Sequence, residues 1–222
     1  MSSEKRKLIE PEQIKMVVAL MLVAVIAALL LGLTDMVTRA PIAEAKKAAL
    51  HRALGQVLPA HANDPLEGVI SIKPVGSSEP KQFYPARDAQ GEITGMAWEA
   101  IAPDGYSGTI HILMGVLPDG SLHAIRITDH RETPGLGDGI LHNSGWLNSF
   151  AGRTLDNVRW RVKKDGGEFD QFTGATITPR AVVKAVKKGL ELFQNNRIAL
   201  LSSKEKGSTD KSETKPAKGD KQ

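Results

Sequence analysis

The strongest constraint on this chain is an apolar run close to its N-terminus. Residues 16–34, 19 positions in all, carry no charge, and nearly all of them are Val, Ala, Leu, Met or Ile. With a helical rise of about 1.5 Å per residue, the run would extend roughly 28 Å, close to the thickness of bilayer hydrocarbon. We therefore predict a single transmembrane helix over residues 16–34, bounded by Lys15 and Asp35.

Two other structures share this composition, a buried core helix and a cleaved signal peptide. A core helix of this length is expected to carry a polar stripe, and the run has none. A signal peptide has an apolar core of about 7–15 residues, followed by a small-residue cleavage site. Here the run is longer, and the best candidate site, Thr38-Arg39-Ala40, is followed by Pro41. The pattern favours a retained anchor over both alternatives.

Basic residues on either side of the run indicate its orientation. Four precede it, three of them clustered at residues 5–7, and three follow it within a similar distance. Because Lys and Arg near a membrane helix favour the cytoplasmic side, residues 1–15 are predicted to form a cytoplasmic tail. The long C-terminal part is then exported.

The absence of cysteine narrows the possible chemistry. With no Cys among 222 residues, disulfides, thiolate zinc sites, Cys-ligated iron–sulfur clusters and C-x-x-C redox pairs are excluded. Any redox function therefore needs a non-thiol cofactor. The six His are scattered without metal-binding spacing, so no metal site is predicted. Nucleic-acid binding is not predicted, because the modest excess of positive charge lies in the tails and on one strand face.

The rest of the chain predicts one α+β domain, an antiparallel sheet with flanking helices. Residues 35–80 are predicted to form a helical stem and loop, 81–198 the domain, and 199–222 a disordered tail that lacks apolar side chains large enough to form a core. The three Trp are expected to pack in the core. Periodicity predicts helices over 41–58 and 179–195, strands over 93–100, 109–117, 121–128 and 158–163, and a turn at 118–120.

Two segments differ from ordinary scaffold. Residues 130–138 follow a strand and are crowded with turn formers, which is typical either of a wide loop or of close backbone approach to a ligand. Their glycine spacing is not a dinucleotide-binding fingerprint. Residues 170–179 lead into the last helix, where free N–H groups favour phosphate. Nearby Lys163, Lys164 and Arg180 add positive charge, but the threonines could equally be caps, with Thr178 as N-cap and Pro179 in the first turn.

The second segment resembles a known attachment motif. In proteins that carry FMN through a phosphoester to threonine the motif is D-x-x-(S/T)-G-A-T, which matches Asp170, Thr173, Gly174, Ala175 and Thr176. The N-terminal anchor, residues 105–108 and residues 132–137 are also similar to the RnfG (RsxG) family, a subunit of the Rnf (Rsx) electron-transport complex. This resemblance covers roughly residues 8 to 198. A related flavoprotein subunit of the sodium-pumping NADH:quinone reductase shares the flavin domain but is usually longer.

The resemblance implies a function and a location. The chain would relay electrons through covalent FMN, as part of ion-coupled electron transfer between NADH and ferredoxin. Its partners would be the other subunits of the Rnf complex and, during maturation, a flavin transferase. It would cross the bacterial inner membrane once, with its domain in the periplasm. No catalytic residue set is implied, and a membrane-anchored flavin-binding sensory module and a non-redox structural protein stay open as alternatives.

The resemblance also implies a set of cofactor-binding residues. Thr176 would carry the phosphoester, its motif neighbours would surround the phosphate, and the two loops would flank the ring. His130 is as consistent with a structural role at the strand end. The predicted cofactor-binding residues are Thr176, Thr173, Gly174, Ala175, Asp170, Glu132, Thr133, Gly135, Leu136, Tyr106 and Ser107.

Overall fold

The computed structural model describes residues 11–74 and 79–202, and its contacts divide the chain after Leu50 into two compact units. The elements follow in the order α1 (Pro11–Val57), β1 (Ile70–Ile72), β2 (Lys81–Arg87), β3 (Ile93–Ala102), β4 (Ile110–Val116), β5 (Leu122–Asp129), α2 (Gly139–His142), α3 (Ser144–Asn148), a short 3-10 turn (Lys163–Asp165) and α4 (Ile177–Leu201).

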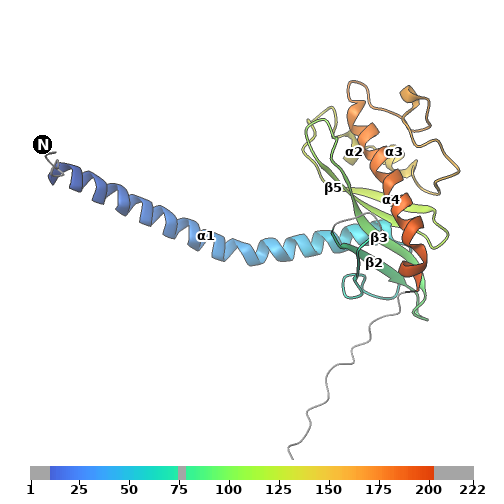
Figure 1. Ribbon diagram of the computed structural model, residues 1–222, viewed down its shortest axis with the longest axis horizontal. Coiled ribbons are helices and arrows are strands. Elements are labelled where there is room, and N and C mark those ends of the chain that lie inside the picture. The colour runs from blue at the N-terminus through green and yellow to red at the C-terminus, as the bar shows by residue number, and fades with distance from the viewer. Residues whose placement is uncertain (1–10, 75–78, 203–222) are drawn as a thin grey trace, which may run out of the picture. The chain divides into compact units, whose positions relative to one another are not determined.

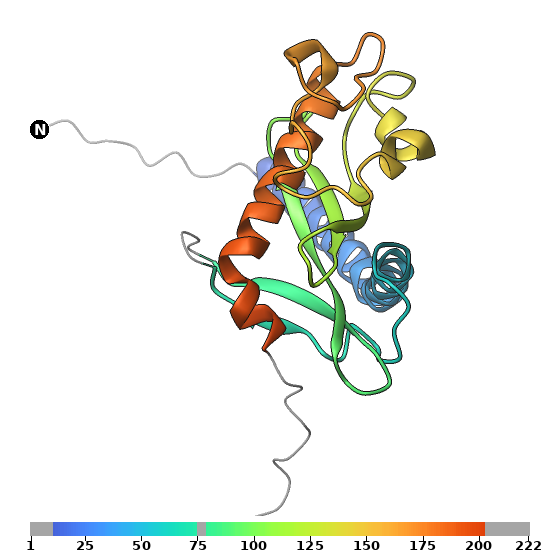
Figure 2. The same cartoon turned by 90° about the vertical axis from the view of Figure 1, so that its right-hand side faces the viewer.

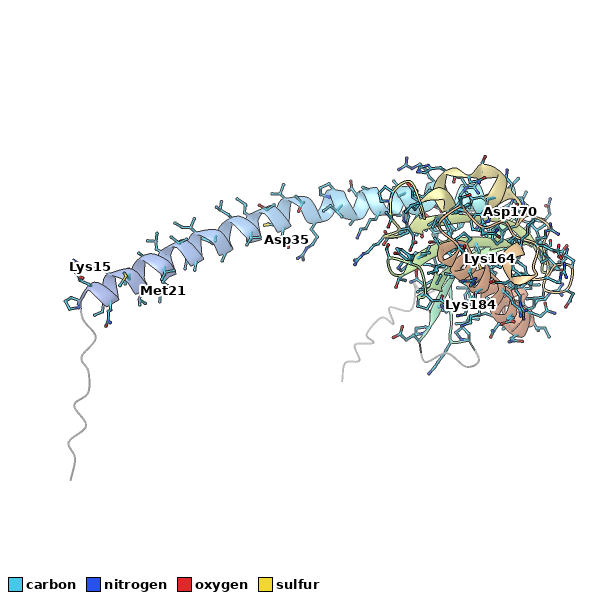
Figure 3. All side chains as sticks on the ribbon, turned by 90° about the horizontal axis from the view of Figure 1, so that it is seen from above. Lys15, Met21, Asp35, Lys164, Asp170 and Lys184 are labelled. Atoms are coloured by element: carbon cyan, nitrogen blue, oxygen red, sulfur yellow. The ribbon has the colours of Figure 1, made fainter. Side chains whose placement is uncertain are left out.

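Helix α1 contains the whole apolar run. All side chains of residues 16–34 are exposed and radiate from the helix between Lys15 and Asp35 (Figure 3), so the run is not a core helix. It is the only helix within the described ranges 11–74 and 79–202 that is long and apolar enough to cross a membrane.

The prediction that a separate helix opens at Pro41 is wrong, because α1 continues through this residue. Proline lacks the N–H that would bond to the carbonyl four residues earlier, and its ring disturbs that turn. The helical bonding of the neighbouring turns is sufficient here to carry the helix across the defect.

Five antiparallel strands form the sheet in the order β1-β2-β3-β4-β5, so each strand pairs with its neighbour in sequence (Figure 1). The strands predicted over 93–100, 109–117 and 121–128 are confirmed as β3, β4 and β5, and the predicted turn joins the last two. Two strands were missed. β1 lies in the segment assigned to the stem and loop, and β2 contains a proline, which weakened its strand signal.

The main core lies between the sheet and α4, which packs on β3 and β4. Trp98 is central to it, with ring centroids 5.5 Å from Phe83 and 5.7 Å from Phe193 of α4. The α+β prediction is confirmed. Helix α4 extends beyond the predicted residue 195 to Leu201, so residues 199–201 are helical and Leu200 is buried. The predicted tail from residue 203 lies outside the described residues.

The last turn of α1 lies against the opposite face of the sheet, within the second unit. A Cβ atom on Gly115 of β4 would stand only 1.9 Å from the carbonyl oxygen of Val57, and one on Gly95 of β3 only 2.6 Å from the ring of Pro59. Leu54 and Val57 are fully enclosed at this contact, with 1% and 0% of their surface exposed. Two glycines therefore let helix and sheet meet backbone to backbone.

The predicted strand over 158–163 is wrong. Val158, Trp160 and Val162 are buried while their neighbours are exposed, as the alternation indicated, but the segment joins no sheet. Within the described residues, its ladder pairing is a single bridge from Val162 to Phe169. Period-two burial requires only an extended backbone over a core, and the partner for a ladder is a matter of tertiary arrangement.

Candidate functional site

A pocket of about 130 Å³ opens where two loops meet the start of α4. Its floor and walls come from the loop after β3, the loop after β5 and the segment that enters α4. Seven of the predicted residues line it together with three that were not predicted. The lining residues are Tyr106, Glu132, Thr133, Leu136, Gly137, Gly174, Ala175, Thr176, Ile177 and Thr178.

The motif segment enters α4 through a tight turn. The N–H of Ala175 donates to the carbonyl of Phe172 at 3.1 Å, and Gly174 at the third turn position has φ +78°. Such a turn needs a positive φ at that position, which glycine adopts without strain. Thr173 is exposed at the tip of the turn, so it is not part of the pocket wall.

Thr176, and not Thr178, is the N-cap of α4, so the predicted cap is wrong by two residues. The side chain of Thr176 makes no capping hydrogen bond, and its backbone has φ −74° and ψ −29°. An N-cap threonine ordinarily uses its hydroxyl to accept from the helix N–H groups. Here the hydroxyl group lies on the pocket wall beside the first turn without being used in that way.

Glu132 ties the three walls together from below. It is 4% exposed, and its carboxylate accepts a hydrogen bond from the Thr178 hydroxyl and another, at 3.0 Å, from the N–H of Ser107. Gly137 comes so close that a Cβ there would stand 2.7 Å from Oε2. Glu132 is therefore buried beneath the loops it joins. His130 supports it, because its Nδ1 accepts from the N–H of Glu132.

The Thr178–Glu132 contact predicts a measurable stability effect. Thr178→Val keeps the shape of the side chain but leaves a buried carboxylate oxygen without its donor, which costs about 1–3 kcal/mol of unfolding free energy. Chemical denaturation of the detergent-solubilised chain measures this. Thr178→Ser keeps the hydroxyl and is the control, expected to lose about 0.8 kcal/mol for one methyl group. Equal stability of Thr178→Val and the wild type would contradict the interpretation.

Exposed apolar side chains form the rim of the pocket. Tyr106, Leu136 and Ile177 are 68%, 49% and 44% exposed. The loop with Tyr106 is fixed to α4 by an ion pair of 2.5 Å between Asp104 and Lys184 (labelled in Figure 3). The hydrogen bond from Lys184 holds the pKa of Asp104 below its usual value.

The basic residues near the motif are largely neutralised by acids. Lys163 pairs with Asp170 at 2.7 Å, and Arg180 makes a bidentate contact with Asp165 at 2.6 and 2.9 Å. The Arg180 hydrogen bonds lower the pKa of Asp165, and in turn raise that of Arg180. In the described part of the chain, Lys164 has no ion pair, and it lies near Asp170 in Figure 3. Positive charge at the pocket therefore comes mainly from the N-terminus of α4.

Several predicted residues stand behind the pocket wall. Ser107 acts through its backbone N–H to Glu132, and Gly135 forms the turn in which the Thr133 carbonyl accepts from Leu136 and Gly137. Asp170 faces Lys163. Sequence reasoning missed Gly137, Ile177 and Thr178 as pocket residues. The run of three threonines from 173 to 178 was a signal for Thr178, but a cap explained it equally well.

Comparison with known proteins fits this arrangement. Residues 105–191 match the family model of the FMN-binding domain, and residues 14–57 match that of the RnfG N-terminal region. The protein is thus of the flavoprotein class with an FMN-binding domain, which confirms FMN as the predicted cofactor.

The relatives narrow the class further. An ion-translocating oxidoreductase complex subunit, lettered G, from Pseudomonas aeruginosa (strain UCBPP-PA14) is 45% identical over 193 residues, covering 83% of this chain and 90% of the relative. The subunit of the same name from Vibrio atlanticus is 42% identical, covering 78% and 86%. The chain belongs to this RnfG family of ion-translocating oxidoreductase complex subunits, as its sequence predicted.

A solved structure is also similar to this chain. The crystal structure of Shewanella oneidensis NqrC matches with a TM-score of 0.47 and 24% identity, covering 65% of this chain and 79% of that one. Membership of the family and the single exposed apolar helix together make α1 a membrane anchor.

Proposed function

We propose that this chain relays electrons through an FMN joined by a phosphoester to Thr176, as a subunit of a membrane-bound ion-translocating oxidoreductase complex. Ion-coupled electron transfer between NADH and ferredoxin is the proposed overall reaction. The observation that carries the proposal is the position of Thr176: its hydroxyl lies on a pocket wall at a helix N-terminus and is not used as a cap. Bound FMN supplies the redox chemistry, because a flavin exchanges electrons in pairs or singly.

The residues of the pocket fit the phosphate end of FMN. The first N–H groups of α4 have no intrahelical partners, so they favour an anionic phosphate next to Thr176. The turn with Gly174 leaves the approach free of side chains, since a Cβ at that glycine would meet only Leu136 Cδ2, at 3.6 Å. A covalent oxygen link would keep the cofactor in place outside the cytoplasm, where a lost flavin is not readily replaced.

The ring end would be held more openly. A pocket of about 130 Å³ is smaller than the roughly 300–1,000 Å³ of sites that enclose a drug-sized ligand. The remainder of the flavin would therefore lie over the apolar rim formed by Tyr106, Leu136 and Ile177. An exposed ring edge suits electron exchange with neighbouring subunits, because the partner's redox group can approach it.

We further propose that residues 1–15 are cytoplasmic and that the domain lies in the periplasm of a bacterial inner membrane, where a flavin transferase attaches the FMN. The Lys and Arg cluster at residues 5–7 supports this orientation. The match of residues 14–57 to a family region supports a retained helix. A membrane-anchored sensory module remains the alternative, but similarity to complex subunits over 83% of the chain favours the carrier.

The proposal predicts membrane-bound, reducible flavin. After expression of the full chain with its complex and a flavin transferase, carbonate-washed membranes should retain the chain, because the 19-residue apolar run has no polar face. The purified complex should contain covalent flavin whose absorbance at its oxidised maximum bleaches when NADH is added with ferredoxin. A chain recovered in the soluble fraction, or one purified without other subunits, would contradict the carrier function.

A further inference from the structure

Trp146 of α3 holds the segment that leads to Thr176. The indole is 4% exposed, and its N–H donates to the carbonyl of Asp170 at 2.9 Å. The same ring meets Phe172 edge-on, with centroids 5.3 Å apart and planes at 61°. Two neighbouring positions of the motif segment are therefore fixed by one side chain. Figures 1 and 2 both place α3 at the end of the domain where α4 begins.

The aromatic ring of Phe172 is enclosed from a second side. A Cβ on Gly139 of α2 would stand 3.2 Å from its Cδ2 atom, so the backbone of α2 lies directly against the ring. The carbonyl of Phe172 is also the acceptor that closes the turn to Ala175. The position of this ring consequently sets the position of the turn.

The other end of the segment is anchored independently. Thr178 is fully buried and bonded to Glu132, in the first turn of α4. Thr176 thus lies between two fixed points, Phe172 with its Trp146 contact on one side and Thr178 on the other. Its hydroxyl is presented at a defined place although the turn itself, with Thr173 and Gly174, is exposed.

We propose that Trp146 is a positioning residue for the covalent attachment of flavin, and this inference rests on the proposed function of Thr176. Formation of a phosphoester needs an activated flavin phosphate, that is, a phosphoanhydride such as flavin adenine dinucleotide. The Thr176 oxygen bonds to the flavin-side phosphorus and releases its proton, the phosphoanhydride bond breaks, and the nucleoside monophosphate leaves. Attack of this kind depends on how accurately the hydroxyl is placed.

The chain contains a matched control for Trp146. Trp160 is also buried, at 8% exposed, and its indole N–H also donates to a backbone carbonyl, that of Thr154, at 3.0 Å. Both indoles belong to the same aromatic cluster, since each contacts Phe150. Trp146→Phe and Trp160→Phe therefore remove comparable hydrogen bonds and comparable core volume. The deleted indole touches the motif segment in the first variant only.

The experiment measures attachment and local order separately. The full chain, purified in detergent from cells without a transferase, is mixed with purified flavin transferase, Mg²⁺ and flavin adenine dinucleotide, and covalent flavin is followed by in-gel fluorescence. Trp146→Phe should lower the initial rate about tenfold and Trp160→Phe by no more than roughly twofold, because only the first displaces the nucleophile. Without transferase, hydrogen exchange at residues 173–176 should accelerate in Trp146→Phe alone.

A second variant covers the case in which Trp146→Phe folds poorly. Phe172→Leu leaves every specified position of the attachment motif intact, so a slower rate in this variant also supports positioning by the ring contact. Equal rates and equal exchange in the Trp146 and Trp160 variants would overturn the inference while leaving Thr176 as the attachment site. If the wild-type chain takes up no covalent flavin, the proposed function itself fails, and the inference fails with it.

Discussion

Replacing Thr176 by Val is expected to abolish covalent flavin completely. Valine has nearly the same shape as threonine but lacks the oxygen that would form the phosphoester. In-gel flavin fluorescence after denaturation, on chain co-expressed with a flavin transferase, measures the effect. The domain should still fold, because the Thr176 hydroxyl makes no capping bond in α4 and the change therefore removes no helix contact.

Two further variants make this result specific. Thr176→Ser restores a hydroxyl at the same position and should restore fluorescence. Denaturation midpoints of the Thr176→Val chain and the wild type should agree to within about 0.5 kcal/mol, as expected of a substitution that breaks no contact. Fluorescence that persists in Thr176→Val would move the ester to another hydroxyl, and Thr173 would be the candidate because Thr178 is buried and bonded to Glu132.

The second large effect is expected at Gly115→Ala. A Cβ at this position of β4 would stand 1.9 Å from the carbonyl oxygen and 2.7 Å from the carbonyl carbon of Val57. Both atoms belong to backbone, in the last turn of α1, so no side-chain rotation relieves the clash and the helix must shift away from the sheet. We expect a loss of about 3 kcal/mol or more of unfolding free energy, at the upper end for overpacked cores.

Gly55→Ala is the matched control on the helix side of the same contact. No atom lies within 4 Å of the Cβ that this change would add. Because Ala is a better helix former than Gly, the variant should be more stable by about 0.5–1 kcal/mol. Chemical denaturation of the detergent-solubilised chain, followed by tryptophan fluorescence, measures both variants. Similar midpoints for Gly115→Ala and the wild type would mean that α1 does not dock on β4 at this glycine.

Local sequence patterns predicted the elements whose burial follows from their own periodicity. The uncharged run of residues 16–34 is helical, the hairpin of β4 and β5 encloses the predicted turn, and α4 buries its predicted apolar face. The motif around Thr176 was visible because it is contiguous. In each case the information lies within one short segment, where side-chain spacing reports directly on backbone period.

Other features depended on which segments meet. The alternation of residues 158–163 described their burial correctly, but the sheet order β1-β2-β3-β4-β5 leaves them no strand to pair with. The N-cap moved from Thr178 to Thr176 because the hydroxyl of Thr178 is bonded to Glu132, 46 residues away. A capping rule cannot include a partner so distant in the sequence.

The sequence by itself therefore determined that this chain has one apolar helix, an α+β domain and a threonine-containing attachment motif, since each is encoded in consecutive residues. Only the tertiary structure decided that Glu132 lies beneath the pocket, that Trp146 fixes the motif segment and that two glycines admit the end of α1 to the sheet. These contacts join residues far apart in the chain, and their energy comes from burial and hydrogen bonding that exist only after the segments have packed together.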